Sequence, residues 1–390
     1  MNFNYTIVLI FISFVGYSQV TISNGNHVLE ITGAISTYYN YRDLKDYSEN
    51  RNKDRFRLRD AQIQLEGRVG DTWEYELQVD FVDLASSATG EIDPENPGLM
   101  EARVTYKGLE FMDVELGYGK LYYSRSSLNP FSFSPYWQRA QIVRGDIFSR
   151  RDVGITLKKD FLRQLVNVYV GAYTGLGEIS LRGDNDSSGA LEYVGRVDFA
   201  YPSRYRYREI DDRVSPIPMF QLGLNGRYTD RQLTEGRPFP DGSKGEYGLK
   251  MIDGKRYVYG MDFSFQYMGF SGQFEIHQMR GEPISPSDPL FHGLAPAQTN
   301  GYFLAGGWLS QVNYFHKPWK SIISLRYEEL DLSDLVAGKS QRLCGALAYQ
   351  IKGFDAMIKA QYFHNLGVQE SLDPLRWNEQ IRIGMQFNFK

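Results

Sequence analysis

The sequence of 390 residues has a single cysteine, Cys344, and no strong excess of charge of either sign. One cysteine excludes an intrachain disulfide framework and a Cys-x-x-Cys metal site. The 43 Lys and Arg stand against 47 Asp and Glu, a formal net charge of -4, whereas nucleic-acid-binding domains usually carry a basic excess. We therefore expect no nucleic-acid partner, and any attraction for anions must be local.

Long apolar runs are also lacking. After residue 18, no stretch offers the roughly 18 apolar residues that a membrane-spanning helix needs. The apolar run Ile7–Val15 is shorter still and is followed by Gly16-Tyr17-Ser18, which places small residues at the -3 and -1 positions of a cleavage site. This pattern predicts a signal peptide over residues 1–18, cleaved after Ser18. The absence of Lys and Arg before the run leaves a buried N-terminal element as the alternative.

Aromatic residues are abundant, at 15% of the chain with 28 Tyr and 24 Phe, and they take part in a regular alternation. Along Trp73–Phe81, aromatic and aliphatic residues alternate with Glu, Gln and Asp. The segment Ile381–Phe389 repeats the pattern at the end of the chain. Because successive side chains of a β-strand point to opposite faces, each such segment predicts a strand with one apolar and one polar face.

We count sixteen such segments, and an even number suits a closed antiparallel barrel. Connections after odd-numbered segments are long, and most connections after even-numbered segments are tight turns. Outer-membrane barrels have this asymmetry when both termini lie in the periplasm. The connection 201–217 is the exception, because it is long where a short turn is predicted. The segments start near residues 28, 55, 73, 99, 111, 151, 164, 190, 218, 256, 270, 301, 320, 341, 354 and 377.

Tyrosines cluster at the predicted strand ends, among them Tyr122, Tyr123 and Tyr201. Such clustering favours an apolar face in contact with lipid over the face of a soluble β-sandwich, which we keep as an alternative. Strands in lipid must form a closed ring, since an open edge would leave backbone groups unpaired. We therefore predict that residues 19–390 form an all-β, 16-stranded antiparallel transmembrane β-barrel, wide enough for a water-filled lumen.

Two local motifs carry a resemblance to a known family. They are Ser149–Ile155 (SRRDVGI), at the end of a long connection, and Phe56–Gly67 (FRLRDAQIQLEG), an arginine-rich entry into an alternating strand. With these motifs and this strand spacing, the chain resembles the phosphate-selective porins O and P. The resemblance implies a homotrimeric outer-membrane channel for small anions such as phosphate. Asp60 and Gln62 depart from the family pattern, which often has arginine there, and Lys390 follows the terminal Phe389.

The longest predicted connection, residues 122–150, is basic, and in porins of this architecture the third loop folds into the lumen as a constriction. A basic excess in a narrow pore would concentrate anions, and arginine binds phosphate oxygens through two donors at once. A solvated surface loop is the alternative. The candidate pore residues are Lys120, Arg125, Arg139, Arg144, Arg150, Arg151 and Asp152.

Two runs of alternating arginines are further candidates, as possible arginine ladders. If the alternation of the strand that follows extended back into the first run, its arginine side chains would point outward. A β-bulge near Asp60 would instead turn them into the channel. The second lies at the predicted periplasmic end. The remaining lumen-facing positions are slightly acidic, so the expected anion preference rests on the loop. The two runs are Arg55, Arg57 and Arg59, and Arg204, Arg206 and Arg208.

Enzyme motifs are scarce. The five histidines have no metal-ligand spacing, and no Gly-x-Ser-x-Gly motif occurs. The segment Asp184–Gly189 resembles the start of a calcium loop but lacks the glutamate that would complete it. We expect no cofactor and no enzymatic activity. The predicted function is passive diffusion of small polar solutes across the bacterial outer membrane, with an anion preference; the alternative is a barrel enzyme or adhesin without transport.

Overall fold

The computed structural model describes residues 20–44, 54–82, 98–177, 189–232, 248–369 and 377–389. The predicted signal peptide, its cleavage site and residues 184–188 of the calcium-like segment lie outside these ranges. Within them, none of the helices has the length and apolar character needed to cross a membrane.

The described residues form seventeen strands and a few helices of three or four residues. The strands are β1 (Val20–Asn24), β2 (His27–Leu44), β3 (Arg55–Val69), β4 (Trp73–Asp80), β5 (Leu99–Tyr106), β6 (Asp113–Lys120), β7 (Arg151–Phe161), β8 (Val166–Tyr173), β9 (Glu192–Tyr201), β10 (Met219–Arg231), β11 (Gly254–Tyr267), β12 (Phe270–Pro283), β13 (Phe303–His316), β14 (Ser321–Asp331), β15 (Ser340–Lys352), β16 (Ala356–Gly367) and β17 (Trp377–Phe389). The helices are α2 (Arg125–Leu128), η2 (Phe131–Phe133), η3 (Gln141–Val143), η5 (Gly248–Lys250), η6 (Pro289–Phe291) and α3 (Pro296–Thr299).

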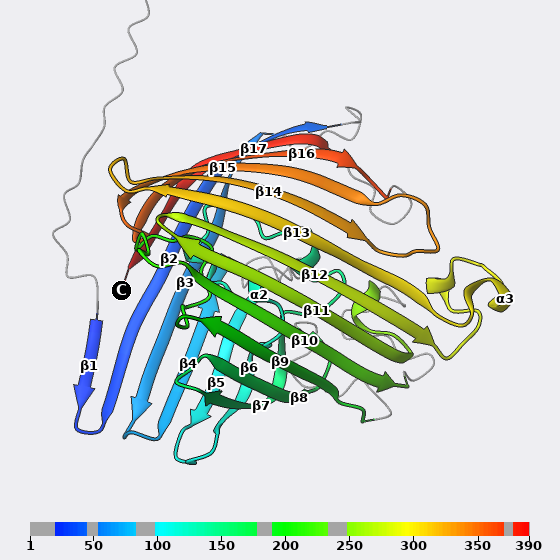
Figure 1. Cartoon of the computed structure of the whole chain (residues 1–390), viewed down its shortest axis with the longest axis horizontal. Coiled ribbons are helices and arrows are strands. Elements are labelled where there is room, and N and C mark those ends of the chain that lie inside the picture. Colours follow the sequence, from blue (N-terminus) through cyan, green and yellow to red (C-terminus); the bar gives the residue numbers. More distant parts are fainter. Residues whose placement is uncertain are drawn as a thin grey trace, which may run out of the picture.

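Strands β2–β17 close into one antiparallel ring (Figure 1). Each of them pairs with the next along the chain, and β17 pairs with β2, with Phe389 opposite Gly33. Strand β1 was not predicted; it forms a hairpin with the first residues of β2, with Val20 opposite Ile31. The prediction of an all-β, 16-stranded antiparallel barrel is confirmed, and β1 adds a short strand that lies on the same edge of β2 as β17.

The barrel wall is apolar outside and polar inside. In β11, Met261 and Phe263 are 39% and 38% exposed on the outer face, while the inward Asp262 and Ser264 are 1% and 2% exposed. A soluble protein would show the opposite distribution. A closed ring satisfies its backbone hydrogen bonds between strands, which strands in lipid require. The soluble β-sandwich alternative is therefore excluded.

The outer face gives a first testable prediction. Leu325 is 62% exposed near the middle of β14, so Leu325→Arg places a charge in hydrocarbon and should destabilise the barrel by about 2–4 kcal/mol. The matched control is Gln64→Arg in β3, because the Gln64 amide donates to the inward carboxylates of Glu66 and Glu76. Urea unfolding in phospholipid vesicles measures both; equal losses of stability would contradict the assignment of the two faces.

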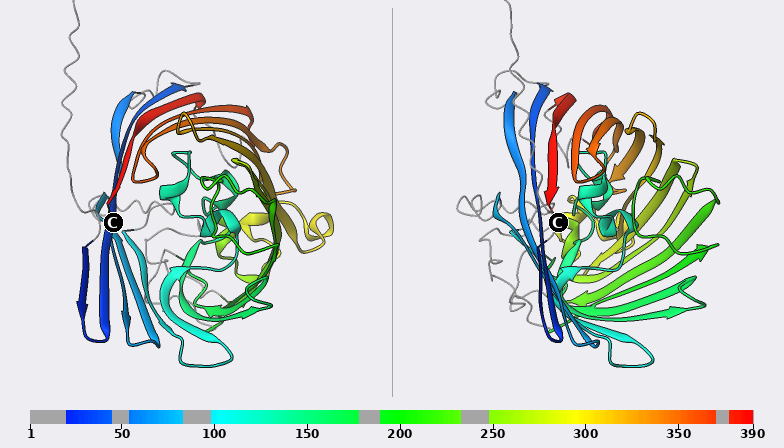
Figure 2. Two further views of the ribbon diagram at one scale, coloured as in Figure 1. Left: turned by 60° about the vertical axis from the view of Figure 1, so that its left-hand side comes forward. Right: turned by 90° about the vertical axis from the view of Figure 1, so that its left-hand side faces the viewer.

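Two irregular segments enter the ring. The first is the connection between β6 and β7, residues 121–150, which lies inside the strands in Figure 2. The second is the connection between β9 and β10, residues 202–218, whose side chains contact the inner wall and the first segment. We call the end of the barrel that bears residues 121–150 the loop end, and the end at which β17 stops the terminus end.

Candidate pore and its lining

The first part of loop 121–150 is tethered to β12. Ser124 caps the short helix α2. From within the helix, Ser126 donates through its backbone N and its Oγ to the Glu275 carboxylate, at 3.0 and 2.6 Å. His277 Nε2 lies 2.6 Å from the same carboxylate, and its Nδ1 lies 3.0 Å from the Tyr123 hydroxyl. Inward polar groups of the wall thus hold the loop where it leaves β6.

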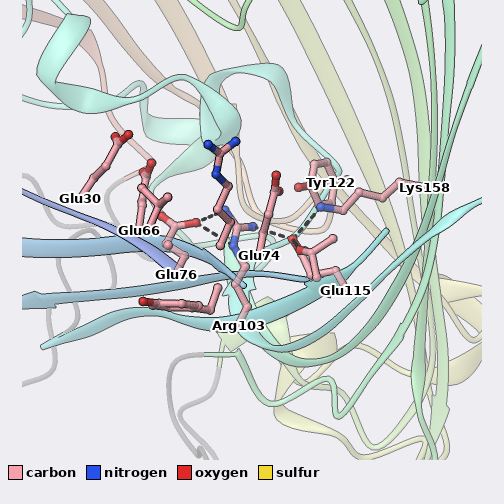
Figure 3. A pocket seen from close by; sticks show the side chains of 13 residues that line it. Glu30, Glu66, Glu74, Glu76, Arg103, Glu115, Tyr122 and Lys158 are labelled. Atoms are coloured by element: carbon pink, nitrogen blue, oxygen red, sulfur yellow. Dashed lines mark hydrogen bonds and ion pairs between the residues drawn. The ribbon is translucent and has the colours of Figure 1, made fainter. Parts of the chain in front are cut away.

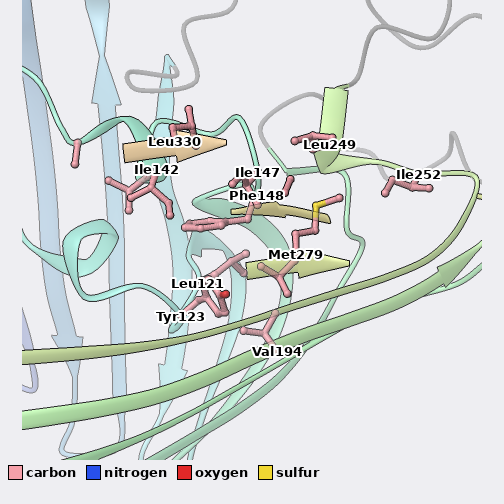
Figure 4. Packing of buried hydrophobic residues seen from close by; sticks show 14 of the residues in the cluster. Leu121, Tyr123, Ile142, Ile147, Phe148, Val194, Leu249, Ile252, Met279 and Leu330 are labelled. Atoms are coloured by element: carbon pink, nitrogen blue, oxygen red, sulfur yellow. The ribbon is translucent and has the colours of Figure 1, made fainter. Parts of the chain in front are cut away.

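The last part of the loop is held by an apolar cluster inside the barrel (Figure 4). Ile142, Ile147 and Phe148 of the loop pack against Met279 of β12 and Leu330 of β14. These inward positions would face water in an open lumen. Because the loop covers them, the part of the lumen beside β11–β14 is filled. Further members of the cluster are Val143, Val194, Val258, Phe303 and Leu309.

The middle of the loop reaches the wall near β2, β3, β16 and β17. Trp137 is 1% exposed, its Nε1 donates to the Lys359 carbonyl at 3.2 Å, and its ring lies 5.3 Å from that of Tyr38. The Trp137 carbonyl accepts from Arg59 Nε at 3.0 Å and from the Arg382 guanidinium at 3.4 Å. The loop therefore crosses the lumen from β12 to β2, β3, β16 and β17.

Most cations predicted to line the pore are buried in these attachments. Arg125, Arg139, Arg150 and Arg151 are 1%, 8%, 2% and 0% exposed. Arg125 donates to the Gln221 amide oxygen at 2.5 Å, Arg139 to the carbonyls of residues 126 and 129, and Arg151 to Glu101 at 3.4 Å. Burial, and then the charges of Arg150 and Arg151, lower the pKa of the Arg139 guanidinium well below its ordinary value. Arg125 thus ties the loop to β10, Arg139 ties two parts of the loop together, and Arg151 of β7 pairs with β5.

The other three predicted residues differ in surroundings. Lys120, at the end of β6, lies 3.9 Å from Glu101. Asp152 is fully buried, and its carboxylate accepts from the Thr174 hydroxyl at 2.5 Å and from the backbone N of residue 175 at 2.6 Å. Arg144 is half-buried and its guanidinium faces the Gln138 amide. Of the predicted set, Arg144 and Lys120 are therefore the more accessible cations.

The first arginine run enters the lumen because the strand has a bulge. The register of β2 against β3 shifts between Ser36 and Thr37, so that Asp60 and Leu58 have successive partners and Arg59 has none in the ladder. Leu58 is 53% exposed on the outer face, and Arg57, next to it and opposite the inward Tyr38, points inward. Because of the bulge, the side chains of this run point inward at the loop end, although continued alternation of the rest of β3 would have turned them outward.

This run forms part of a group of positive charges at the loop end. Arg42 of β2 lies close enough to Arg55, Arg57 and Arg144 for their charges to repel one another. In the described part of the chain, the buried Nε atoms of Arg42 and Arg57 have no hydrogen-bond partner. Arg59 is different, because it fastens the loop and forms an ion pair with Asp60 at 2.5 Å. Sequence alternation alone did not identify Arg42 as a member of this group.

The second arginine run does not form a ladder. Arg204 donates to Asn167 and to the Tyr169 hydroxyl, at 2.8 and 2.7 Å. Arg208 lies over the ring of Phe133 in loop 121–150, 4.3 Å from its centre, and Arg206 is exposed. The three side chains diverge because residues 202–218 are not a strand.

An open cavity of about 440 Å³ lies along β2–β7 at the terminus end (Figure 3). Glu30 stands opposite Glu66, and Glu66 opposite Glu76, so three carboxylates form a row across β2, β3 and β4. Arg103 continues this row and pairs with Glu76 at 2.5 Å and Glu115 at 3.3 Å. The cavity is more acidic than basic. Its other lining residues include Arg68, Glu74, Tyr75, Tyr122 and Lys158.

Side chains that could ligate a metal or act as nucleophiles also occur inside the barrel, among them Ser126, Glu275 and His277. Among the residues that the structure describes, no group of three or more His, Cys, Asp and Glu is arranged to hold a metal ion. Ser126, Glu275 and His277 are close together, but the serine donates to the glutamate and not to the histidine. This is an arrangement that fixes a loop, and it lacks the serine–histidine hydrogen bond of an acyl-transfer site.

A comparison with protein families gives a match to one of them. Residues 30–203 match the family described as phosphate-selective porin O and P. Over these residues, the chain is similar to that family. The match confirms the resemblance predicted from the sequence, and it spans β2–β9 together with loop 121–150.

Solved structures agree with this chain in fold. The outer-membrane expressed OmpT of Vibrio cholerae is 10% identical, covers 95% of this chain and 100% of its own, and has a TM-score of 0.59. Salmonella typhi OmpF in complex with daunomycin is 12% identical, covers 95% of this chain and 100% of its own, and has a TM-score of 0.58. The outer membrane channel DcaP of Acinetobacter baumannii is 14% identical, covers 94% of this chain and 99% of its own, and has a TM-score of 0.57. At these identities the likeness is one of fold.

A comparison with curated proteins gives no match. The family match, the closed ring and its apolar outer face together identify an outer-membrane channel. In such barrels the longer loops are extracellular and the short turns periplasmic. We therefore expect the loop end to be extracellular and the terminus end periplasmic.

Proposed function

We propose that this porin lets small polar solutes diffuse passively across the outer membrane, with a preference for anions such as phosphate. The group of Arg42, Arg55, Arg57 and Arg144 at the extracellular end carries the proposal. Closely spaced guanidiniums in a narrow, low-dielectric opening raise the local concentration of anions. The free Nε donors of Arg42 and Arg57 would bind phosphate oxygens.

Loop 121–150 has a different part in this proposal from the one that its charge suggested. Arg125 fixes the loop to β10 and Arg139 holds two parts of the loop together, and the loop would narrow the passage to the β2–β7 side. Arg144 is the loop residue that joins the extracellular arginine group. The loop would thus set the size of the solute, and the arginine group would set the preferred charge.

The periplasmic cavity moderates this preference. Glu30, Glu66 and Glu76 face it, and Arg103 pairs with Glu76. An anion that passes the arginine group would therefore not be held tightly on its way out, as conduction requires. We also propose a homotrimer, since a solved structure of Vibrio cholerae OmpT with 10% identity and a TM-score of 0.57 is described as a trimer form.

Purified protein in planar bilayers tests the proposal directly. Under a potassium chloride gradient, the reversal potential should have the sign of an anion-selective pore. Added phosphate on the extracellular side should lower the chloride current in a saturable manner, because it occupies the arginine group. The same concentration of sulfate controls for ionic strength and charge. A reversal potential of the cation-selective sign would refute the proposal, and the absence of a conducting channel would favour the barrel enzyme or adhesin.

A further inference from the structure

The connection 202–218 has a core of its own inside the barrel. Ile210 is 1% exposed and packs against inward side chains of β13, β14 and β16, among them Phe315 and Met357. The Asp211 carboxylate accepts from the backbone N of Ser215 at 2.8 Å and from the backbone N of Gly269 at 2.9 Å. A periplasmic turn of this length is therefore fixed to the inner wall.

One residue of this connection joins the wall to loop 121–150. The Glu209 carboxylate accepts from the Ser134 hydroxyl of the loop at 2.8 Å and from the Gln311 amide of β13 at 3.1 Å. The Glu209 carbonyl accepts from Ser271 at 2.7 Å and from Asn313 at 2.9 Å. Both the side chain and the backbone of Glu209 are thus held by the wall, and its carboxylate holds the loop.

Neighbouring residues make further contacts with the same part of the loop. The guanidinium of Arg208 lies over the ring of Phe133. The backbone carbonyl of Arg208 accepts a hydrogen bond from Arg125 at 3.4 Å. Arg125 also lies over the rings of Tyr205 and Tyr207, at 5.3 and 5.5 Å from their centres. The connection therefore supports the loop from α2 to the end of η2.

Loop residues 125–134 depend on such support. Their regular structure consists of the four residues of α2 and the three of η2, so their position is set by side-chain contacts and not by a sheet. We propose that residues 202–218 form a strut that holds loop 121–150 against the β9–β16 wall, with Glu209 as its positioning residue. The strut thereby sets the width of the passage along β2–β7. This inference goes beyond charge preference, because it would hold for a channel of either selectivity.

Single-channel recordings of Glu209→Ala and Glu209→Gln test the strut. In Glu209→Ala the Ser134 hydroxyl loses its acceptor, whereas Gln311 keeps its bond to Asn313, so the loop should leave the wall part of the time. The mean open conductance should rise about twofold, with increased current noise, since local opening of a weakly held segment becomes measurable. Glu209→Gln retains a side-chain oxygen for Ser134 and should restore most of the wild-type behaviour. Arg213→Ala, an exposed position of the same connection, should leave conductance and noise unchanged.

Other outcomes would overturn the inference. Wild-type conductance and noise in Glu209→Ala would show that the strut is not needed. Equal shifts of the reversal potential in both Glu209 variants, with unchanged noise, would show that Glu209 acts as a charge in the pore and not through the loop. Trypsin added to folded protein gives an independent readout, since release of the loop should expose Arg125 and Arg139 to cleavage in Glu209→Ala only. None of these readouts depends on the wild-type channel preferring anions.

Discussion

Replacing Arg42, Arg55 and Arg57 together by glutamine should remove most of the anion preference of the channel. The three side chains lie at the extracellular end, close enough to repel one another, and two of them have free buried donors. Loss of three positive charges from a confined opening should lower the ratio of chloride to potassium permeability by roughly tenfold. The shift of the reversal potential under a potassium chloride gradient measures this ratio.

A variant with the same change of charge serves as control. Arg163, Lys317 and Lys320 are exposed cations at periplasmic turns, and their joint replacement by glutamine should leave the reversal potential close to wild type. If both triple variants shift the potential equally, overall charge decides selectivity and the arginine group has no special part. If neither shifts it, the selectivity lies elsewhere in the lumen.

The loop arginines are a less suitable target for this measurement. Arg125 donates to Gln221 of β10, and Arg139 to the carbonyls of residues 126 and 129. Alanine at these positions would leave the acceptors unsatisfied and move the loop. A change of selectivity in such variants would then combine the loss of charge with a change in pore width. Arg42 and Arg57 are better targets, because within the described residues their buried Nε atoms have no hydrogen-bond partner to lose.

The strands were predictable from the sequence because a barrel wall has a simple periodic environment. All sixteen predicted segments correspond to strands, from β2 at His27 to β17 at Trp377. Lipid on one face and water or polar groups on the other impose a period of two on every strand. The short strand β1 was missed because its exposed residues, such as Ile22 and Ser23, lie on the hairpin below the ring and do not meet two different environments.

The interior was less predictable because it depends on contacts between distant parts of the chain. Trp137 meets Lys359 and Arg382, more than two hundred residues away along the chain. One local signal was present: Val258 and Met279 are apolar residues on the otherwise polar face of β11 and β12. They indicate that something other than water covers the inner wall there, and the structure shows that loop 121–150 does so.

The arginine runs illustrate the same limit. Alternation placed Arg55, Arg57 and Arg59 on one face, and a bulge decided which way that face points. The bulge divides their roles, since Arg57 joins the extracellular group while Arg59 binds the loop and Asp60. For Arg204, Arg206 and Arg208 the alternation had no meaning, because irregular backbone sends each side chain in its own direction. Residue spacing is therefore informative only where the chain is a strand.

Charge is distributed along the axis of the channel and not only around its narrowest part. Arg42 and Arg57 lie at the extracellular end, whereas the row of Glu30, Glu66 and Glu76 lies at the periplasmic end. Both groups belong to the β2–β7 side, where the open cavity lies at the terminus end. The width of the passage then becomes decisive, because both groups act only on a solute that is held close to them.

That width gives the last prediction: Trp137→Ala should raise the single-channel conductance several-fold. The indole is 1% exposed and joins the middle of the loop to Tyr38 and Lys359. Removing a buried tryptophan side chain costs about 3–5 kcal/mol, more than an irregular loop segment is expected to withstand without detaching. Trp319→Ala, at a periplasmic turn where the indole is 73% exposed, provides the matched control and should conduct as wild type. An unchanged conductance in Trp137→Ala, with the barrel folded as judged by its resistance to unfolding in detergent, would show that the loop does not limit the passage.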